Sequence, residues 1–413
     1  MAERVLVTGI GSISSFGVGH SAFNKAIASG LSGIDRVTGF DTSGCHSHTA
    51  AAVRDFDPTV FIQPLKLRRI DTVGRYAIAG AHILFADAAC RPGPEGCNDI
   101  GVALGTYTAG LDSLVEYLDG LTARGPMGVP AILFSNTVQN APASLCAIEF
   151  GLRGPNVTFN QREASSLAAI AFSVGAIRRG RALAMVTGGA DCLEETFFKV
   201  YDRFRALSPM PVGGVAAPTE GARPFDRARN GFILGEGAYL LLLESAAAAD
   251  ARGARIYGEV LGVGGSASST PLNQWPTDAR GLVNAMRLAL SDAAIEPRDI
   301  TAVFATANGS PALDRLEADA LCKLFGDRAV PVVSIKGAIG ESGAAAAAAV
   351  ISGLHAVASG ELPPTAGLCA VDPALRVAAS YHRQRALEDT FLVNSVASGG
   401  TNYSLVVRAQ RDA

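Results

Sequence analysis

The sequence predicts an α/β fold that contains an internal duplication. Short runs rich in Val, Ile, Leu and Ala alternate along the chain with Ala-rich stretches of helical length, and such alternation of buried strands with helices is typical of α/β proteins. Glycines stand at the ends of the apolar runs, where tight strand-to-helix turns need them. A strand, a small-residue turn and an alanine-rich helix occur once in each half, which indicates related halves that meet near residue 250.

The apolar runs predict the strands in chain order. They are Arg4–Thr8, Ile100–Leu104, Asn156–Asn160, Ala182–Val186, Gly258–Leu261, Ala302–Ala305, Val330–Ser334 and Phe391–Asn394. Helices are expected over 164–178 and 342–359, whose small residues allow close packing between two sheets. We therefore expect an N-terminal unit, 1–250, and a C-terminal unit, 251–413. The Pro/Gly-rich stretch Phe197–Phe225 is expected to be a long ordered loop, a common place for function.

The composition excludes several classes of protein. Of the 413 residues, 48% are apolar and 18% are charged, and the net charge is −3. This balance excludes a disordered chain and a strongly basic nucleic-acid binder. The longest apolar runs are too short to span a membrane. The N-terminus has no basic stretch followed by an apolar signal region, so we expect a cytoplasmic protein without nucleic-acid or membrane partners.

The seven cysteines argue against a disulfide framework and against a structural zinc site. They are scattered, odd in number, and include no Cys-x-x-Cys pair. We expect most of them to be small core residues, and we expect the protein to use no metal and no cofactor.

Seven segments, in order along the chain, resemble the motifs of the β-ketoacyl synthase (ketosynthase) family. They are RVLVTGIGSISSFG, LKLRRIDTVGRYAI, GPNVTFNQREASSLAAI, ALAMVTGGAD, ARPFDRARNGFILGEGAYLLLLE, SIKGAIGESGAAAAA and NSVASGGTNYSLVV. The resemblance spans essentially the whole chain. It implies a thiolase-like duplicated fold with the layers α-β-α-β-α.

The family's nucleophile position falls on Glu163 in this chain. In the family a Cys attacks an acyl thioester, which requires a thiolate at a helix N-terminus. No cysteine lies within ten residues of Glu163. A carboxylate is a much poorer nucleophile toward a thioester, and its product would be a labile anhydride. An acid in the first turn of a helix is also favoured by the helix dipole, and this ordinary role is compatible with a missing nucleophile.

The resemblance implies that the other catalytic positions are changed as well. The family uses two His residues to polarise the malonyl thioester during decarboxylative condensation. Here Asn308 takes the first His position and Glu341 takes the second, while Lys336 matches the family lysine. Ser398 replaces the Phe of the family's gating turn. We therefore expect no intact catalytic residue and five vestigial positions.

The two acids and the lysine are expected to converge if the family fold holds. Two carboxylates and one ammonium in a dry pocket need pairing. We expect Lys336 to bridge at least one carboxylate, and one of two neighbouring carboxylates to have a raised pKa. The alternative is that Lys336 only holds a backbone loop.

Loss of the Cys and of both His residues resembles the chain-length factor of type II polyketide synthases. Such a subunit is non-catalytic, pairs with an active ketosynthase as a heterodimer, and shapes the tunnel for a chain carried by an acyl carrier protein. Most such factors have Gln at the Cys position, so Glu163 indicates a divergent branch, one that makes reduced, polyene or fatty-acid-like chains. The alternative is a β-ketoacyl-[acyl-carrier-protein] synthase-like enzyme with residual condensing or malonyl-decarboxylating activity.

Two further segments are candidates for the tunnel and the partner interface. Leu111, Leu114 and Leu118 form one apolar helical stripe, which is either a tunnel wall or plain core packing. A polar set in the next motif is either a border of the interface or a capped helix start. It comprises Ser135, Asn136, Gln139 and Asn140. The basic cluster at 66–69 is either a docking patch for an acidic carrier protein or a solvated charge run.

Overall fold

A twelve-stranded mixed sheet forms the frame of the protein. The structure, a computed structural model, describes residues 3–93, 95–209, 219–386 and 388–411. The strands follow the order β13-β11-β10-β15-β16-β9-β1-β8-β7-β5-β6, and β2 lies beside β1. Their bounds are β1 Val5–Ser14, β2 Gly17–Val18, β5 Ile100–Gly105, β6 Asn156–Phe159, β7 Ala184–Asp191, β8 Gly237–Ser245, β9 Gly258–Ala267, β10 Ala302–Phe304, β11 Pro331–Val333, β13 Ala378–Ala379, β15 Thr390–Val396 and β16 Thr401–Ala409.

The sheet contains the same pairing pattern twice. In the first half, β1 and β8 are antiparallel, as are β8 and β7, whereas β7–β5 and β5–β6 are parallel. In the second half, β9–β16 and β16–β15 are antiparallel, whereas β15–β10 and β10–β11 are parallel. An antiparallel contact between β1 and β9 joins the two patterns. The predicted duplication and all eight predicted strands are therefore confirmed, although several strands are longer than expected.

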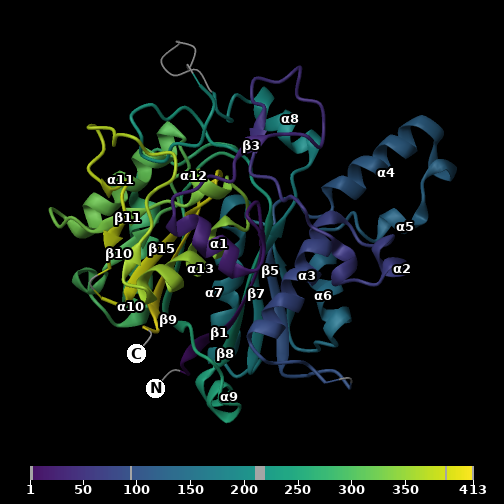
Figure 1. Ribbon diagram of the computed structural model, residues 1–413, viewed down its shortest axis with the longest axis horizontal. Helices are drawn as coiled ribbons and strands as arrows, with labels where there is room; N and C mark the ends of the chain where they lie inside the picture. Colours follow the sequence, from purple (N-terminus) through teal and green to yellow (C-terminus); the bar gives the residue numbers. More distant parts are fainter. Residues whose placement is uncertain (1–2, 94, 210–218, 387, 412–413) are drawn as a thin grey trace.

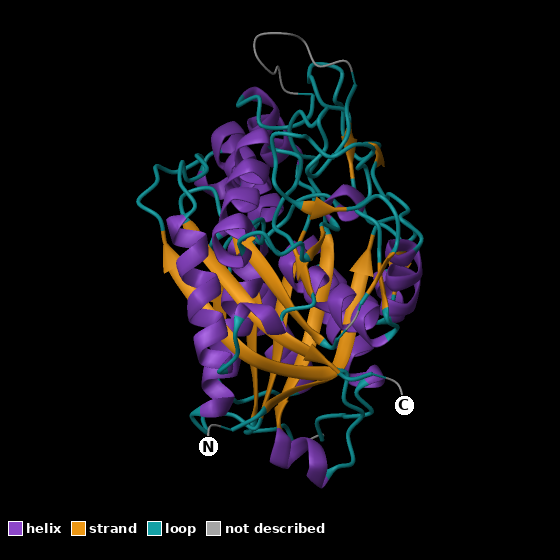
Figure 2. Cartoon of the chain, turned by 90° about the vertical axis from the view of Figure 1, so that its left-hand side faces the viewer, coloured by secondary structure: helices purple, strands orange, loops and turns teal. Residues whose placement is uncertain are grey.

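Helices cover both faces of each half. Helices α3 and α6 pack on the outer face of the first half, and α10 and α11 pack on the outer face of the second. Helices α7 and α13 lie between the halves and contact strands of both. Figure 2 shows the strands gathered in the middle with helices packed around them. The layers are thus α-β-α-β-α, as the resemblance implies. The helix bounds are α1 His20–Ala28, α2 Pro64–Leu67, α3 Thr72–Asp87, α4 Leu111–Arg124, α5 Ala131–Phe134, α6 Ala141–Phe150, α7 Ser165–Arg178, α8 Glu195–Arg203, α9 Ala246–Ala251, α10 Arg280–Ala293, α11 Pro311–Phe325, α12 Lys336–Ile339 and α13 Ala345–Ala358.

The central helices approach the strands so closely that side-chain volume is excluded. A Cβ atom on Gly105, at the end of β5, would lie 2.3 Å from the carbonyl carbon of Ser165, where α7 begins. A Cβ on Gly189 of β7 would lie 3.0 Å from the Cα of Ala344, beside the start of α13. Separations this short leave no room for a methyl group. Glycine in the strands and alanine in the helices therefore set the spacing of the middle layer.

The expected long loop Phe197–Phe225 is wrong in its first part. Helix α8 covers 195–203 and is capped by Glu194, whose carboxylate accepts the backbone N–H groups of Thr196 and Phe197. Its buried residues Phe198, Tyr201 and Asp202 follow a helical spacing that the Pro/Gly-rich residues after the helix obscured. Residues 210–218 lie outside the described part of the chain.

Helices α4 and α5 extend from the body as an arm (Figure 1). We define the arm as residues 111–138. Its apolar side chains are widely exposed, with Met127 98% and Phe134 65% accessible. In the described part of the chain, no helix is long and apolar enough to cross a membrane.

Candidate functional site

Glu163 lies where the sequence predicts, immediately before helix α7. It belongs to a short 3-10 turn, Arg162–Ala164, and its side chain is only 2% exposed. Its carboxylate Oε2 accepts the backbone N–H of Ser398 at 3.0 Å. The Ser398 hydroxyl lies 3.0 and 3.1 Å from the two carboxylate oxygens. The acid is thus held by the turn that follows β15.

Arg162 is a partner that sequence reasoning missed. Its Nη1 donates to the Ser398 hydroxyl at 2.9 Å, and its guanidinium lies 5.7 Å from the ring centre of Tyr107. The residue has φ +53°, which is uncommon outside glycine. The Ser165 hydroxyl donates to the Arg162 carbonyl at 2.6 Å and fixes this conformation. Only its adjacency to Glu163 in the sequence could have indicated this role.

Glu341 forms the centre of a second buried network. Its Oε2 accepts from Lys336 Nζ at 2.8 Å and from Asn308 Nδ2 at 2.7 Å. All three side chains are at most 3% exposed. Lys336 also lies 3.4 Å from the Thr306 hydroxyl. The expected bridge from Lys336 to a carboxylate is confirmed. The same ammonium group also contacts Thr306, in the loop before Asn308.

Two acids in the first turns of α11 hold the loop that carries Asn308. Asp314 Oδ1 accepts the backbone N–H groups of Asn308 and Gly309 at 3.0 and 3.1 Å. Glu317 accepts those of Thr306 and Ala307 at 3.0 and 2.8 Å. Burial raises the pKa of both acids, to about 7 for Asp314. These acids therefore position a loop rather than act on a ligand.

Glu163 and Glu341 line one small cavity. Its volume is about 10 Å³, which barely accommodates one water molecule. Burial raises the pKa of Glu163 to about 7, and the nearby Glu341 carboxylate adds to this effect. The expectation that the acids converge, with one pKa raised, is confirmed. The other lining residues are Tyr107, Thr108, Asp191, Cys192, Leu193, Phe197, Tyr201, Phe232, Leu234, Gly235 and Ser342.

Among the described residues that line the cavity, Cys192 is the one with a thiol. Burial raises the pKa of that thiol well above its usual value. A neutral, buried thiol is a poor nucleophile. In the part of the chain that the structure describes, no histidine lines the cavity. His20 lies 3.1 Å from Asp87 and stacks on His355 between α1 and α13.

The leucine stripe does not belong to the core of this chain. Leu111 and Leu114 are half-buried on α4, and Leu118 is 48% exposed. The alternative of plain core packing therefore does not hold for Leu118, and the tunnel-wall alternative stays a prediction. A helical period shows that a face is apolar, but it does not show what covers that face.

The polar set before α6 divides into one buried and three exposed residues. Asn136 is 6% exposed and donates to the Arg69 carbonyl at 2.9 Å, so it holds the chain locally. Ser135, Gln139 and Asn140 are exposed. Asn140 precedes α6 but makes no side-chain capping bond, so the alternative of a capped helix start is not supported at Asn140. Pro142 near the helix start removes one of the N–H groups that a cap would satisfy.

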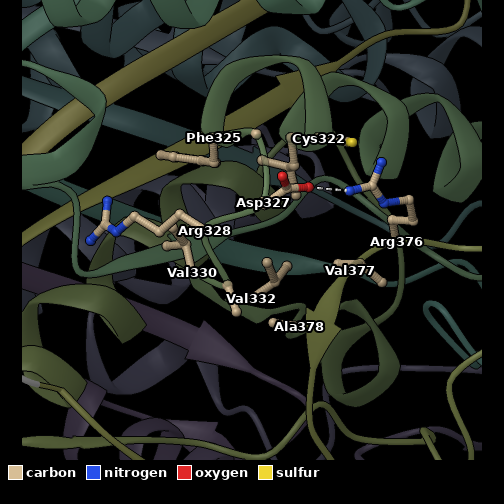
Figure 3. A pocket seen from close by; sticks show the side chains of 12 residues that line it. Cys322, Phe325, Asp327, Arg328, Val330, Val332, Arg376, Val377 and Ala378 are labelled. Carbon is tan, nitrogen blue, oxygen red and sulfur yellow. Dashed lines mark hydrogen bonds and ion pairs between the residues drawn. The ribbon is translucent and has the colours of Figure 1, made fainter.

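A separate hollow of about 220 Å³ lies beside α11 and β13 (Figure 3). Asp327 and Arg376 form an ion pair of 2.8 Å across it, and both side chains are largely exposed. An exposed pair of this kind contributes little to stability. None of the residues of the Glu163 and Glu341 networks lines this hollow, so it is not part of the candidate site.

Comparison with known proteins identifies two matching family models. Residues 2–249 match the model described as "Beta-ketoacyl synthase, N-terminal domain", and residues 257–368 match "Beta-ketoacyl synthase, C-terminal domain".

Three similar proteins are of known type. A 3-oxoacyl-[acyl-carrier-protein] synthase 2 of Coxiella burnetii is 30% identical over 98% of both chains. The ketoacyl synthase beta subunit of the tetracenomycin polyketide synthase of Streptomyces glaucescens is 31% identical, also over 98% of both chains. A solved structure described as the ishigamide ketosynthase/chain length factor superposes with a TM-score of 0.92 at 30% identity, and covers 99% of this chain and 100% of its own.

Removing the lysine should strongly destabilise the protein. In the Lys336→Met variant, the buried Glu341 carboxylate loses its ionic partner, which we expect to lower the free energy of unfolding by about 3–5 kcal/mol. The double variant Lys336→Met/Glu341→Gln removes the orphaned charge and should regain most of that loss. Urea denaturation measures both effects, and a single variant as stable as wild type would contradict the ion-pair assignment.

Replacing Glu163 should change how stability depends on pH. The folded-state pKa of Glu163, about 7, exceeds the ordinary value of 4.5. The contribution of this carboxyl group to the free energy of unfolding is therefore complete below about pH 4.5 and is lost as the pH rises through about 7. The Glu163→Gln variant has no group that titrates at this position, so it lacks this loss. From about pH 5 to about pH 8, its free energy of unfolding should therefore rise relative to that of wild type by up to about 3 kcal/mol. Urea denaturation midpoints of the variant and of wild type at about pH 5 and about pH 8 test this prediction. A difference between the two proteins that is the same at both pH values would refute it.

Proposed function

Because the chain belongs to the β-ketoacyl synthase family, we propose that it is a non-catalytic chain-length-factor subunit of a type II polyketide or fatty-acid-like synthase. In this role it pairs with an active ketosynthase and shapes the tunnel for the growing acyl chain. The polyketide beta subunit and the ketosynthase/chain length factor reported above are similar over the full length of the chain, which supports the proposal.

The arrangement around Glu163 carries this proposal. The three positions at which the family has Cys and two His residues hold Glu163, Asn308 and Glu341, and all three are at most 2% exposed. Glu341 accepts from both Asn308 and Lys336, and the Asn308 amide is committed to Glu341, so neither residue is available to polarise a substrate carbonyl. A folded scaffold with a closed, fully bonded site suits a subunit whose chemistry is done by a partner.

The edge of the first half supports pairing with a second ketosynthase-type chain. Strand β6 ends the sheet, and in the described part of the chain it pairs only with β5. An unpaired strand edge is a template for another strand. The arm lies on the same half, and its exposed Leu118, Met127 and Phe134 need cover. A heterodimer that buries both features satisfies the backbone groups and removes the apolar surface from water.

The leucine stripe on α4 suits a tunnel wall at that interface. Leu111, Leu114 and Leu118 share one face of α4 and remain half-buried or exposed in the single chain. Leucine fills less of a channel than phenylalanine does, so a long linear chain fits beside it. Ser135, Gln139 and Asn140 lie in the same region and supply polar groups for the interface rim.

An acyl carrier protein is the second proposed partner. Arg68 and Arg69 are exposed beside the end of α2, and Lys66 forms an ion pair of 2.7 Å with Glu149. The cluster therefore keeps a net positive charge on the surface, which suits an acidic protein.

Coexpression tests the pairing. The chain should copurify with a ketosynthase of the same genome that carries the Cys and both His residues, and the pair should elongate a malonyl-charged carrier protein. The chain alone should neither condense nor decarboxylate malonyl groups. Phe134→Glu should abolish copurification, because it puts a charge into the apolar contact, whereas Leu288→Glu on α10 should not. Acylation and elongation on the isolated chain would refute the proposal and favour a condensing enzyme.

A bulkier residue in the stripe should shorten the product. In the heterodimer, Leu114→Phe narrows the tunnel, and we expect products at least one extension unit shorter, with the copurified amount of partner unchanged. Leu288→Phe adds the same bulk at an exposed position outside the arm and serves as the control. Mass spectrometry of the carrier-bound chains gives the lengths, and unchanged lengths would contradict the wall assignment.

A further inference from the structure

We infer that Glu163 is a positioning residue that locks the turn 397–400 shut over the cavity. The lock consists of Glu163, Ser398 and Arg162. This inference rests on the proposed function in one respect, that a subunit without chemistry keeps its own pocket closed. The contacts that define the lock lie within this chain and do not depend on a partner.

The Glu163 side chain separates the turn from the cavity. Its carboxylate lines the cavity, and the same carboxylate accepts the backbone N–H and the hydroxyl of Ser398. The hydroxyl in turn accepts from Arg162 Nη1, so its own proton points to Glu163. Three residues therefore form a continuous chain of donors and acceptors in which each bond fixes the direction of the next.

Both ends of the lock are fixed to the surrounding structure. The Ser395 hydroxyl, on β15, donates to the Glu163 carbonyl at 3.0 Å. On the outer side, the Gly399 N–H donates to the Gln274 carbonyl at 2.9 Å, and the Ser268 N–H donates to the Gly400 carbonyl at 2.7 Å. Both glycines have positive φ, which permits this tight turn. The turn is thus held from the cavity side by Glu163 and from the surface side by the 268–274 loop.

The closed state has a direct reporter in Cys192. This thiol lines the cavity behind Glu163 and is 4% exposed. Cys146, on α6, is also buried, at 0% exposed, but it lies in the outer helical layer and does not line the cavity. A reagent that reaches Cys192 but not Cys146 therefore reports opening of the cavity rather than general unfolding.

The test is alkylation of the full-length chain by iodoacetamide at about pH 8.5, with labelled peptides identified by mass spectrometry. Glu163→Met fills a similar volume but accepts no hydrogen bond, whereas Glu163→Gln keeps one acceptor oxygen for the Ser398 N–H. We expect Glu163→Met to label Cys192 at least about 10-fold faster than wild type, and Glu163→Gln to stay within about 3-fold of wild type. Cys146 should stay unlabelled in all three.

The Ser398→Ala variant is a second test, in which we expect the turn to open over the cavity less than in Glu163→Met. It removes the hydroxyl that joins Arg162 to Glu163, leaves the carboxylate in place, and should label Cys192 at a rate between those of wild type and Glu163→Met. Amide hydrogen exchange of the peptide that spans 396–402 should accelerate in the same order. Unchanged labelling of Cys192 in Glu163→Met and Ser398→Ala, or equal labelling of Cys192 and Cys146, would overturn the lock.

The labelling uses no partner and no carrier protein, so its outcome separates from that of the coexpression experiment. If the heterodimer fails to form while the labelling rates of Cys192 follow the expected order, the lock is supported and the chain-length role is refuted. If the heterodimer elongates chains while Cys192 is labelled equally slowly in every variant, the chain-length role is supported and the lock is refuted.

Discussion

The carboxylate of Asp191 is the interaction on which the geometry of the middle layer depends. It stands at the end of β7, and its Oδ1 accepts the backbone N–H groups of Tyr107 and Thr108, which follow β5. Its Oδ2 accepts the N–H of Ala344, at the start of α13. One buried acid therefore joins the strand ends of the first half to the central helix of the second. The position of Glu341, three residues before Ala344, follows from this junction.

The candidate site shows how a fold keeps its shape after its chemistry is replaced. A buried carboxylate is costly unless hydrogen bonds or an opposite charge compensate for lost water. Glu341 receives an ammonium and an amide, while Glu163 receives a backbone N–H and a hydroxyl. The two acids are satisfied by different means, and burial raises the pKa of Glu163 to about 7. Each substituted residue is thus integrated into the hydrogen bonding of the fold.

Periodicity and motif order in the sequence predict the strands, the duplication and the convergence of Glu163, Glu341 and Lys336. The pairing of Lys336 with a carboxylate was also predicted, but the bonds of Arg162 and Ser398 around Glu163 were not, because the hydrogen bond from Arg162 to Ser398 joins segments more than 200 residues apart. The sequence also suggested a loop where α8 forms, since its turn-rich continuation masked a short amphipathic pattern. The leucines of α4 show a further limit, because an apolar face is equally regular whether its own chain or another covers it.

The alanine run at the start of α13 has a consequence for how such a protein can change over time. Residues 345–349 are all alanine and all buried between the two halves, where strand glycines leave no spare volume. A larger side chain there would have to push the halves apart, and a polar side chain would be buried away from water. Divergence is thereby directed away from the centre and toward the cavity, the turns and the arm, so that new roles arise at the margins of an interior that stays nearly constant.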